Sequence, residues 1–84
     1  MTPAQQTNDL IKLSQLKPGE WGTIIRYQGR GDVSHRLQEL GLIRGAKIQV
    51  KRLAPLGDPM ELVIQNYHLS IRKKDASQIL VLRG

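Results

Sequence analysis

The side chains that could bind a metal ion are scattered through the sequence. The candidates are two histidines, His35 and His68, and two carboxylates, Asp58 and Glu61. Zinc and calcium ligands usually recur at short, fixed spacings, for example as two histidines about three residues apart or as several acids in one loop. These four residues show no such spacing, and a working site also needs neighbours that orient its ligands. We therefore expect no bound metal and no other cofactor, with both histidines facing solvent.

The serines lack the partners that nucleophilic catalysis requires. A serine nucleophile needs a base within hydrogen-bond reach and a further group that orients the base. Ser34 and His35 are neighbours in the sequence, but this local pair is not such an arrangement. A chain of 84 residues also has a thin core, with little room for an enclosed substrate pocket. We therefore predict that the protein is not an enzyme.

The segment Ala54-Pro55-Leu56-Gly57-Asp58-Pro59 is the best candidate for contacting a partner. Leu56 is an apolar residue between proline and glycine, and Asp58 is driven toward an extended conformation by the proline that follows it. Loops presented by a rigid scaffold often carry binding residues. We therefore predict partner contacts from Pro55, Leu56, Gly57 and Asp58. A second outcome stays open, in which Leu56 folds back and covers one end of the core.

A predicted helix before Gly41 supplies a second set of candidates. Leu37 and Leu40 share one face of it, with Leu42 just beyond, and Gly41 stands where a helix-terminating glycine belongs. Most such leucines in a small domain face inward, although Leu40 could belong to a docking stripe. Arg36 and Glu39 lie off the apolar face. We predict that Arg36, Glu39 and Leu40 contact a partner, the alternative for the charged residues being an exposed pair three residues apart.

The elements that must position these residues are short. A helical turn is expected over residues 9–16, a tight turn over 17–20, and a short turn or 3₁₀ segment over 73–76. Alternating apolar and polar residues predict five strands, at 21–27, 47–51, 60–64, 67–72 and 78–82. We expect a bulge at Ile24-Ile25, and a left-handed Asn66 in the turn at 65–66. Short strands at close spacing predict a small barrel or sandwich, and closure into a barrel removes exposed edges.

Length and composition predict one cytoplasmic domain. The sequence has no cysteine, which excludes disulfides and thiolate metal sites. Its polar start has no apolar signal-peptide core, and no apolar run approaches the roughly 18 residues that a membrane span needs. We expect a flexible polar tail over residues 1–9 and a single domain over residues 10–84. The predicted location is the cytoplasm.

Charge is concentrated in the second half of the chain. Residues 1–42 hold five basic and four acidic side chains, whereas residues 43–84 hold eight basic and three acidic ones. This excess suits an anionic partner, so a small barrel that binds nucleic acid is an alternative function. Such proteins usually pair a basic groove with stacking aromatics, and this chain has only Trp21, Tyr27 and Tyr67, of which Trp21 and Tyr67 are expected in the core or at its rim. Nucleic acid is therefore the less favoured partner.

Most of the chain, from about residue 13 to residue 81, resembles the ferrous iron transport protein A (FeoA) family. Asn66 departs from the family pattern, which usually has glycine there, but asparagine keeps the turn feasible. The segments that carry the resemblance are Leu13-Ser14-Gln15-Leu16-Lys17-Pro18-Gly19-Glu20, Arg36-Leu37-Gln38-Glu39-Leu40-Gly41-Leu42, Ala54-Pro55-Leu56-Gly57-Asp58-Pro59 and Tyr67-His68-Leu69-Ser70-Ile71-Arg72-Lys73-Lys74-Asp75-Ala76.

The resemblance implies a mainly β fold, a small SH3-like β-barrel of about five strands with one short inserted helix. It also implies a cytosolic accessory of the ferrous iron transporter, a membrane protein with a GTP-binding cytosolic region, and hence an interaction with that transporter. Similar SH3-like domains end some iron-dependent repressors, which is a further alternative. No helix-turn-helix precedes the domain in this sequence, which begins at Met1, so a free-standing accessory is the favoured interpretation.

Overall fold

The computed structural model describes residues 10–28 and 32–84, with the side chains of residues 32 and 33 excepted. The tail predicted for residues 1–9 lies outside this part of the chain. In chain order the elements are β1 (Leu10–Lys12), the 3₁₀ turn η2 (Leu13–Gln15), β2 (Trp21–Tyr27), α1 (Asp32–Glu39), β3 (Lys47–Leu53), β4 (Met60–Ile64), β5 (Tyr67–Ile71), α2 (Lys73–Ala76) and β6 (Ile79–Arg83).

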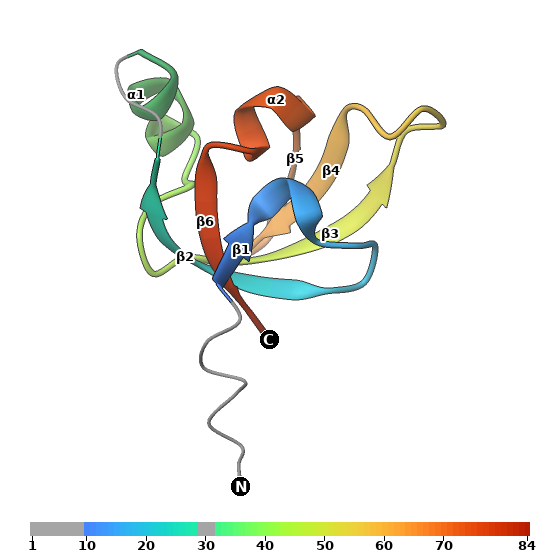
Figure 1. Ribbon diagram of the computed structural model, residues 1–84, viewed down its shortest axis with the longest axis horizontal. Helices are drawn as coiled ribbons and strands as arrows, with labels where there is room; N and C mark the ends of the chain where they lie inside the picture. Colours follow the sequence, from blue (N-terminus) through green and yellow to red (C-terminus); the bar gives the residue numbers. More distant parts are fainter. Residues whose placement is uncertain (1–9, 29–31) are drawn as a thin grey trace, which may run out of the picture.

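All six described strands belong to one antiparallel sheet, in the order β1-β6-β2-β3-β4-β5. Figure 1 shows that this sheet bends strongly around a central core, with α1, α2 and the β3–β4 connection at one end and the start of β1 and the C-terminus at the other. The described strands β1 and β5 stand at the two ends of the order, so the sheet is barrel-like without being closed by hydrogen bonds. The register between β2 and β6 shifts between Ile24 and Arg26, which confirms the expected bulge.

Alternation along the strands builds the core. In β4 the first, third and fifth residues are buried, and in β3 Ile48 and Val50 are buried while Lys47 and Lys51 are exposed. No polar or charged side chain among the described residues is buried. The core therefore depends on apolar packing, from these fully buried side chains: Leu13, Leu16, Ile24, Leu37, Leu42, Ile48, Val50, Met60, Leu62, Ile64, Ile79 and Val81.

The start of the domain differs from the prediction. A helical turn was expected over residues 9–16, but Leu10–Lys12 form strand β1, which pairs with β6, and only Leu13–Gln15 are helical, as a 3₁₀ turn. The threefold spacing of leucines indicated a helix, but pairing with a distant strand satisfies the backbone of residues 10–12. The burial of Leu13 and Leu16 does not depend on which local structure forms.

The described residues form six strands and two helices where about five strands and one helix were expected. The additional strand is β1, and residues 73–76 form the short α-helix α2 where a short turn or 3₁₀ segment was expected. In the β4–β5 turn the left-handed residue is Gln65, with φ 53°, and not Asn66. No helix within residues 10–28 and 32–84 is long and apolar enough to cross a membrane.

Candidate docking surface

Helix α1 ends in a Schellman motif that sets the direction of the following chain. The Gly41 N–H donates to the Gln38 carbonyl at 3.0 Å, and the Leu42 N–H donates to the Leu37 carbonyl at 3.1 Å. Gly41 adopts φ 102°, which a residue with a Cβ atom rarely occupies. The motif turns Leu42 into the core, where Leu37 is also buried, and leaves Leu40 39% exposed. Of the three candidate leucines, only Leu40 is accessible to a partner.

A hydrogen bond from β2 fixes the segment after α1. The Tyr27 hydroxyl donates to the carbonyl of Leu42 at 2.5 Å. Burial raises the pKa of Tyr27 from 10.0 to about 12, because desolvation disfavours the phenolate. The neutral phenol is therefore the form that holds the end of α1 against the sheet.

The β3–β4 loop presents Leu56 at its apex. Residues 54–57 form a β-turn, closed by the Gly57 N–H donating to the Ala54 carbonyl at 2.6 Å. Proline at the second position and glycine at the fourth suit a type I turn. Leu56 occupies the third position and is 96% exposed. The alternative in which Leu56 folds back onto the core is therefore wrong.

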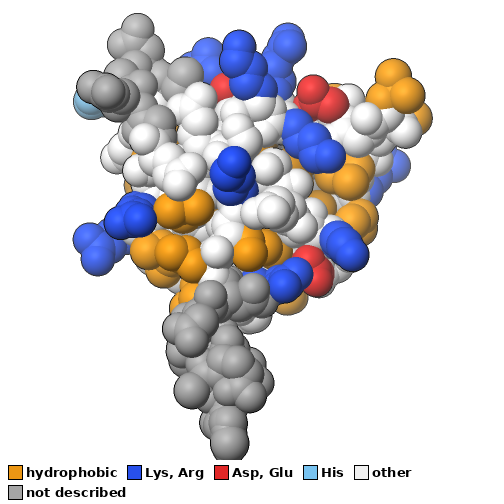
Figure 2. Space-filling model, in the orientation of Figure 1, with side chains coloured by type: hydrophobic (Ala, Val, Ile, Leu, Met, Phe, Trp, Pro, Cys, Tyr) orange, Lys and Arg blue, Asp and Glu red, His pale blue; other side chains and the backbone are white. Residues whose placement is uncertain are grey.

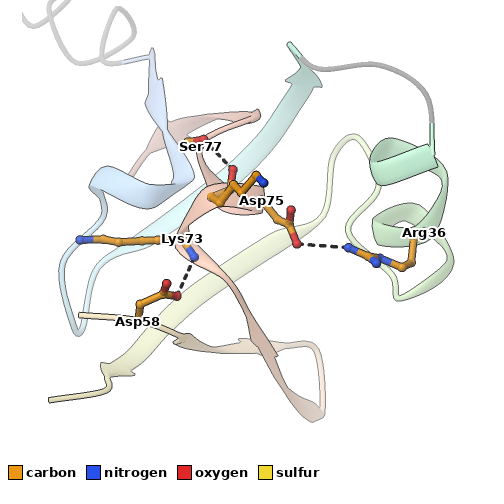
Figure 3. Close-up of polar contacts among 6 residues, drawn as sticks. Arg36, Asp58, Lys73, Asp75 and Ser77 are labelled. Atoms are coloured by element: carbon orange, nitrogen blue, oxygen red, sulfur yellow. Dashed lines mark hydrogen bonds and ion pairs between the residues drawn. The ribbon is translucent and has the colours of Figure 1, made fainter. Parts of the chain in front are cut away.

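Helix α2 is bonded to both candidate regions. Asp58 Oδ1 accepts a hydrogen bond from the Lys73 backbone N–H at 2.9 Å, which ties the loop to the first turn of α2. Asp75 Oδ2 forms an ion pair with Arg36 Nη2 at 3.2 Å, which ties α1 to α2. Figure 3 shows α2 between these two contacts. One short helix thus positions the loop and α1 relative to each other.

The predicted contact residues come together at one end of the molecule. Figure 1 places α1, α2 and the β3–β4 connection along the same end, with α2 in the middle. In Figure 2, Lys and Arg side chains gather over α2, and hydrophobic side chains project from the tip of the β3–β4 connection. We call this end the α1–α2–loop surface. Its predicted members, all accessible to some degree, are Arg36, Glu39, Leu40, Pro55, Leu56, Gly57 and Asp58.

Two of these residues have contacts that the sequence did not indicate. Arg36 pairs with Asp75 rather than with Glu39. Asp58 is exposed overall, but its carboxylate binds the backbone of Lys73, so it positions the loop as well as lining its surface. Asp75 and Lys73 were not among the predicted site residues. Their sequence signal was weak, because charged residues in a short segment usually indicate only a solvated turn.

Two hollows lie on this surface. One, of about 250 Å³, is lined by Asp58, Pro59 and Arg72. The other, also of about 250 Å³, is a groove between α1 and the end of β5, and its lining residues are Arg36, Leu37, Leu40, Ser70, Ile71, Arg72 and Asp75. Both are open depressions of a size that admits one or two side chains. They can receive a partner's side chains but cannot enclose a substrate.

The described residues show no metal centre. His35 and His68 are exposed, and no group of three His, Asp or Glu side chains within residues 10–28 and 34–84 could hold a metal ion. Among the serines, Ser34 Oγ accepts a hydrogen bond from the Gln38 amide, and Ser77 Oγ donates to the Lys74 carbonyl. These two hydroxyls therefore form local hydrogen bonds, one within α1 and one at the end of α2.

The exposed aromatic residues lie on opposite faces of the sheet. Trp21 and Tyr67 are 47% and 43% exposed, so of the two expected positions, core or rim, the core is excluded for both. Trp21 is in register with Gln49, whereas Tyr67 is in register with Ile64 and, through it, with buried Ile48. Because neighbouring residues of a strand point to opposite faces, Trp21 and Tyr67 cannot form one stacking platform.

The chain matches the FeoA domain model over residues 11–83. It belongs to the FeoA family. A curated relative, the Fe(2+) transport protein A/Fe(2+) transporter FeoB fusion protein of Porphyromonas gingivalis, is 39% identical over 71 residues, which are 84% of this chain. The chain spans only 8% of the length of that relative.

Solved FeoA structures share this fold. The solution structure of FeoA from Chlorobium tepidum is 42% identical, with a TM-score of 0.79 over 86% of this chain and 69% of that chain. The zinc complex of FeoA from Stenotrophomonas maltophilia, described as an SH3 domain protein, is 20% identical, with a TM-score of 0.76 over 88% of this chain and 95% of that chain. The expected SH3-like, mainly β fold is confirmed.

A repressor shares the same fold at lower identity. A manganese-dependent transcriptional repressor is 16% identical, with a TM-score of 0.80 over 99% of this chain and 43% of that chain. This likeness concerns architecture alone. Membership of the FeoA family therefore rests on the matched family model and on the relatives of higher identity.

Proposed function

We propose that this protein is a non-enzymatic, cytosolic accessory of bacterial ferrous iron uptake that docks onto the GTP-binding cytosolic region of the ferrous iron transporter. Docking uses the α1–α2–loop surface, with Leu56 as its apolar contact. The protein works by binding and positioning, without a metal or other cofactor of its own.

The exposure of Leu56 is the observation that carries this proposal. A leucine that is 96% exposed at the apex of a hydrogen-bonded turn contributes nothing to the core. Its loop is held to α2 by Asp58, so little conformational entropy remains to be lost when a partner binds. Burying an exposed leucine at an interface removes apolar surface from water and is worth roughly 1.5–3 kcal/mol.

The fusion relative supports the choice of partner. In the Porphyromonas gingivalis protein, Fe(2+) transport protein A and the transporter FeoB form one chain. Covalent linkage holds two modules at high effective concentration, which benefits domains that act on each other. We extend this association to the present chain as an interaction between separate proteins.

The position of the aromatic residues disfavours nucleic acid as the partner. Trp21 and Tyr67 lie on opposite faces, and none of the residues that line the two hollows of the α1–α2–loop surface is aromatic. Single-stranded nucleic acid binding relies on bases stacked along one basic groove. A protein partner suits this surface better.

Calorimetric titration of the protein into the purified cytosolic region of the transporter, at physiological salt, tests the proposal. We expect saturable binding at a defined stoichiometry, measured with and without guanine nucleotide. A single-stranded oligonucleotide serves as the second titrant. Absence of binding to the transporter in both nucleotide states, together with oligonucleotide binding that weakens steeply with salt, would reject docking in favour of nucleic acid.

A further inference from the structure

Arg72 lies at the centre of the α1–α2–loop surface. It immediately precedes α2, with an extended backbone at φ −75° and ψ 146°, and its side chain is exposed. It lines both hollows, the one beside Asp58 and Pro59 and the groove beside α1. Arg72 therefore borders both the Leu56 loop and the groove beside α1.

The two carboxylates that line a hollow together with Arg72 are engaged elsewhere. Asp58 accepts the backbone hydrogen bond of Lys73, and Asp75 pairs with Arg36. The ion pairs within the described part of the chain join Arg36, Arg52 and Arg83 to acids, but none joins Arg72 to one. Lys73 and Lys74 are also exposed beside it, so the surface around Arg72 is mainly cationic.

The groove beside Arg72 has an apolar floor. Leu37 and Ile71 are 2% and 5% exposed, and Leu40, which is 39% exposed, forms the accessible part of the wall. The Arg36–Asp75 ion pair crosses between α1 and α2 at this site (Figure 3). An apolar side chain placed in the groove would contact Leu40, while a neighbouring carboxylate would reach Arg72.

We propose that Arg72 is the central contact of the docking surface and that it binds a carboxylate of the partner. The partner segment carries an acidic residue beside an apolar one, and the apolar side chain enters the groove over Leu40. A guanidinium can bind a carboxylate through two parallel hydrogen bonds, which gives both charge and geometric complementarity. Arginine is also enriched among the residues that dominate interface energies. This inference rests on the proposed function, since it names the chemistry of the transporter segment that docks.

Calorimetric titration of three arginine variants into the transporter's cytosolic region provides the test. The variants are Arg72→Glu, Arg72→Lys and, as matched control, Arg26→Glu; Arg26 is an exposed arginine on β2 that has no acidic partner among the described residues. We expect Arg72→Glu to weaken binding by at least about tenfold, and Arg72→Lys to weaken it by a smaller factor because lysine lacks the bidentate fork. Arg26→Glu should stay within about twofold. Thermal unfolding checks that each variant folds.

A charge exchange gives the test a second arm. Each Asp and Glu of the transporter's cytosolic region is replaced in turn by Arg, and one replacement should weaken wild-type binding and restore binding to Arg72→Glu. If wild type binds and Arg72→Glu binds equally well, this inference is wrong while the proposed docking stands. If wild type fails to bind the transporter at all, both are wrong. Tight oligonucleotide binding that requires Arg72 would also overturn the inference, by assigning Arg72 to phosphate.

Discussion

The carboxylate of Asp58 binds the backbone N–H of Lys73 at 2.9 Å, across 15 positions of sequence. The contact joins the loop that presents Leu56 to the first residue of α2. An acceptor at that position satisfies a helix N–H that has no partner within the helix, and its negative charge suits the helix start. The same bond therefore stabilises α2 and restricts the loop.

Removing this acceptor should loosen both elements. We expect Asp58→Ala to lower the free energy of unfolding by about 1 kcal/mol, as for the loss of a helix cap. Urea denaturation measures the loss, and amide hydrogen exchange should show faster exchange at Lys73. Asp58→Asn keeps a side-chain oxygen acceptor and should lose less. Equal stability of wild type and Asp58→Ala, with unchanged Lys73 exchange, would contradict this role.

Replacing Leu56 should affect binding without affecting stability. Leu56→Ser removes a side chain that is 96% exposed, so we expect the free energy of unfolding to change by less than about 0.5 kcal/mol. Affinity for the transporter's cytosolic region should fall at least about fivefold. Leu10→Ser is the matched control, because Leu10 is also exposed but belongs to β1. Similar losses of affinity in both variants would argue against a specific contact at the loop.

Tyr27 should make stability depend on alkaline pH. Its folded-state pKa of about 12 lies above the ordinary value of 10.0, so the folded state holds the phenolic proton more tightly than the unfolded state does. This contribution is fully present below pH 10 and is lost as the pH rises from 10 to 12. We expect the free energy of unfolding to fall over that window more steeply in wild type than in Tyr27→Phe. Parallel curves for the two proteins would show that Tyr27 is not the responsible group.

Gly41 and Gly45 offer a paired test of the helix terminus. Both have positive φ, at 102° and 89°, but a Cβ at Gly41 would meet the Tyr67 hydroxyl, whereas the space at Gly45 is open. Gly45→Ala should lower the free energy of unfolding by about 1 kcal/mol because alanine is strained at this positive φ. Gly41→Ala should cost more, because the Tyr67 hydroxyl that donates to the Leu40 carbonyl must also move. Thermal denaturation compares the stability of the two variants. An equal loss of stability in both would mean that the Tyr67 side chain moves aside without an energetic penalty.

Local patterns were sufficient for much of the fold. Apolar residues at alternate positions predicted β4 between residues 60 and 64, and the structure places it there. Gly41 predicted the end of α1, because a Schellman motif favours a residue without a Cβ. Both signals depend on interactions among a few neighbouring residues, so they can be recognised without knowledge of the tertiary structure. The Ala54-Pro55-Leu56-Gly57 turn is another such local signal, and it correctly predicted that Leu56 lies in a loop.

Contacts between distant residues could not be predicted in this way. The spacing of Leu10, Leu13 and Leu16 favoured a helix, but residues 10–12 pair with β6 at the other end of the chain. Arg36 and Asp75 are 39 positions apart, so neither residue type nor period relates them. The functional role inferred for Arg72 likewise depends on two hollows whose walls come from separate parts of the chain.

The sequence by itself indicated the family through the segments that resemble it. Propensity and periodicity, which are properties of neighbouring residues, determined the Ala54–Gly57 turn and the burial pattern of most strands. Only the tertiary structure decided that Leu56 points into solvent, that Asp58 binds α2, and that Arg72 lines two hollows. Those outcomes depend on how the sheet bends and on which distant backbone groups it brings within hydrogen-bond distance. That bending is a collective result of packing the whole core, so no single segment encodes it.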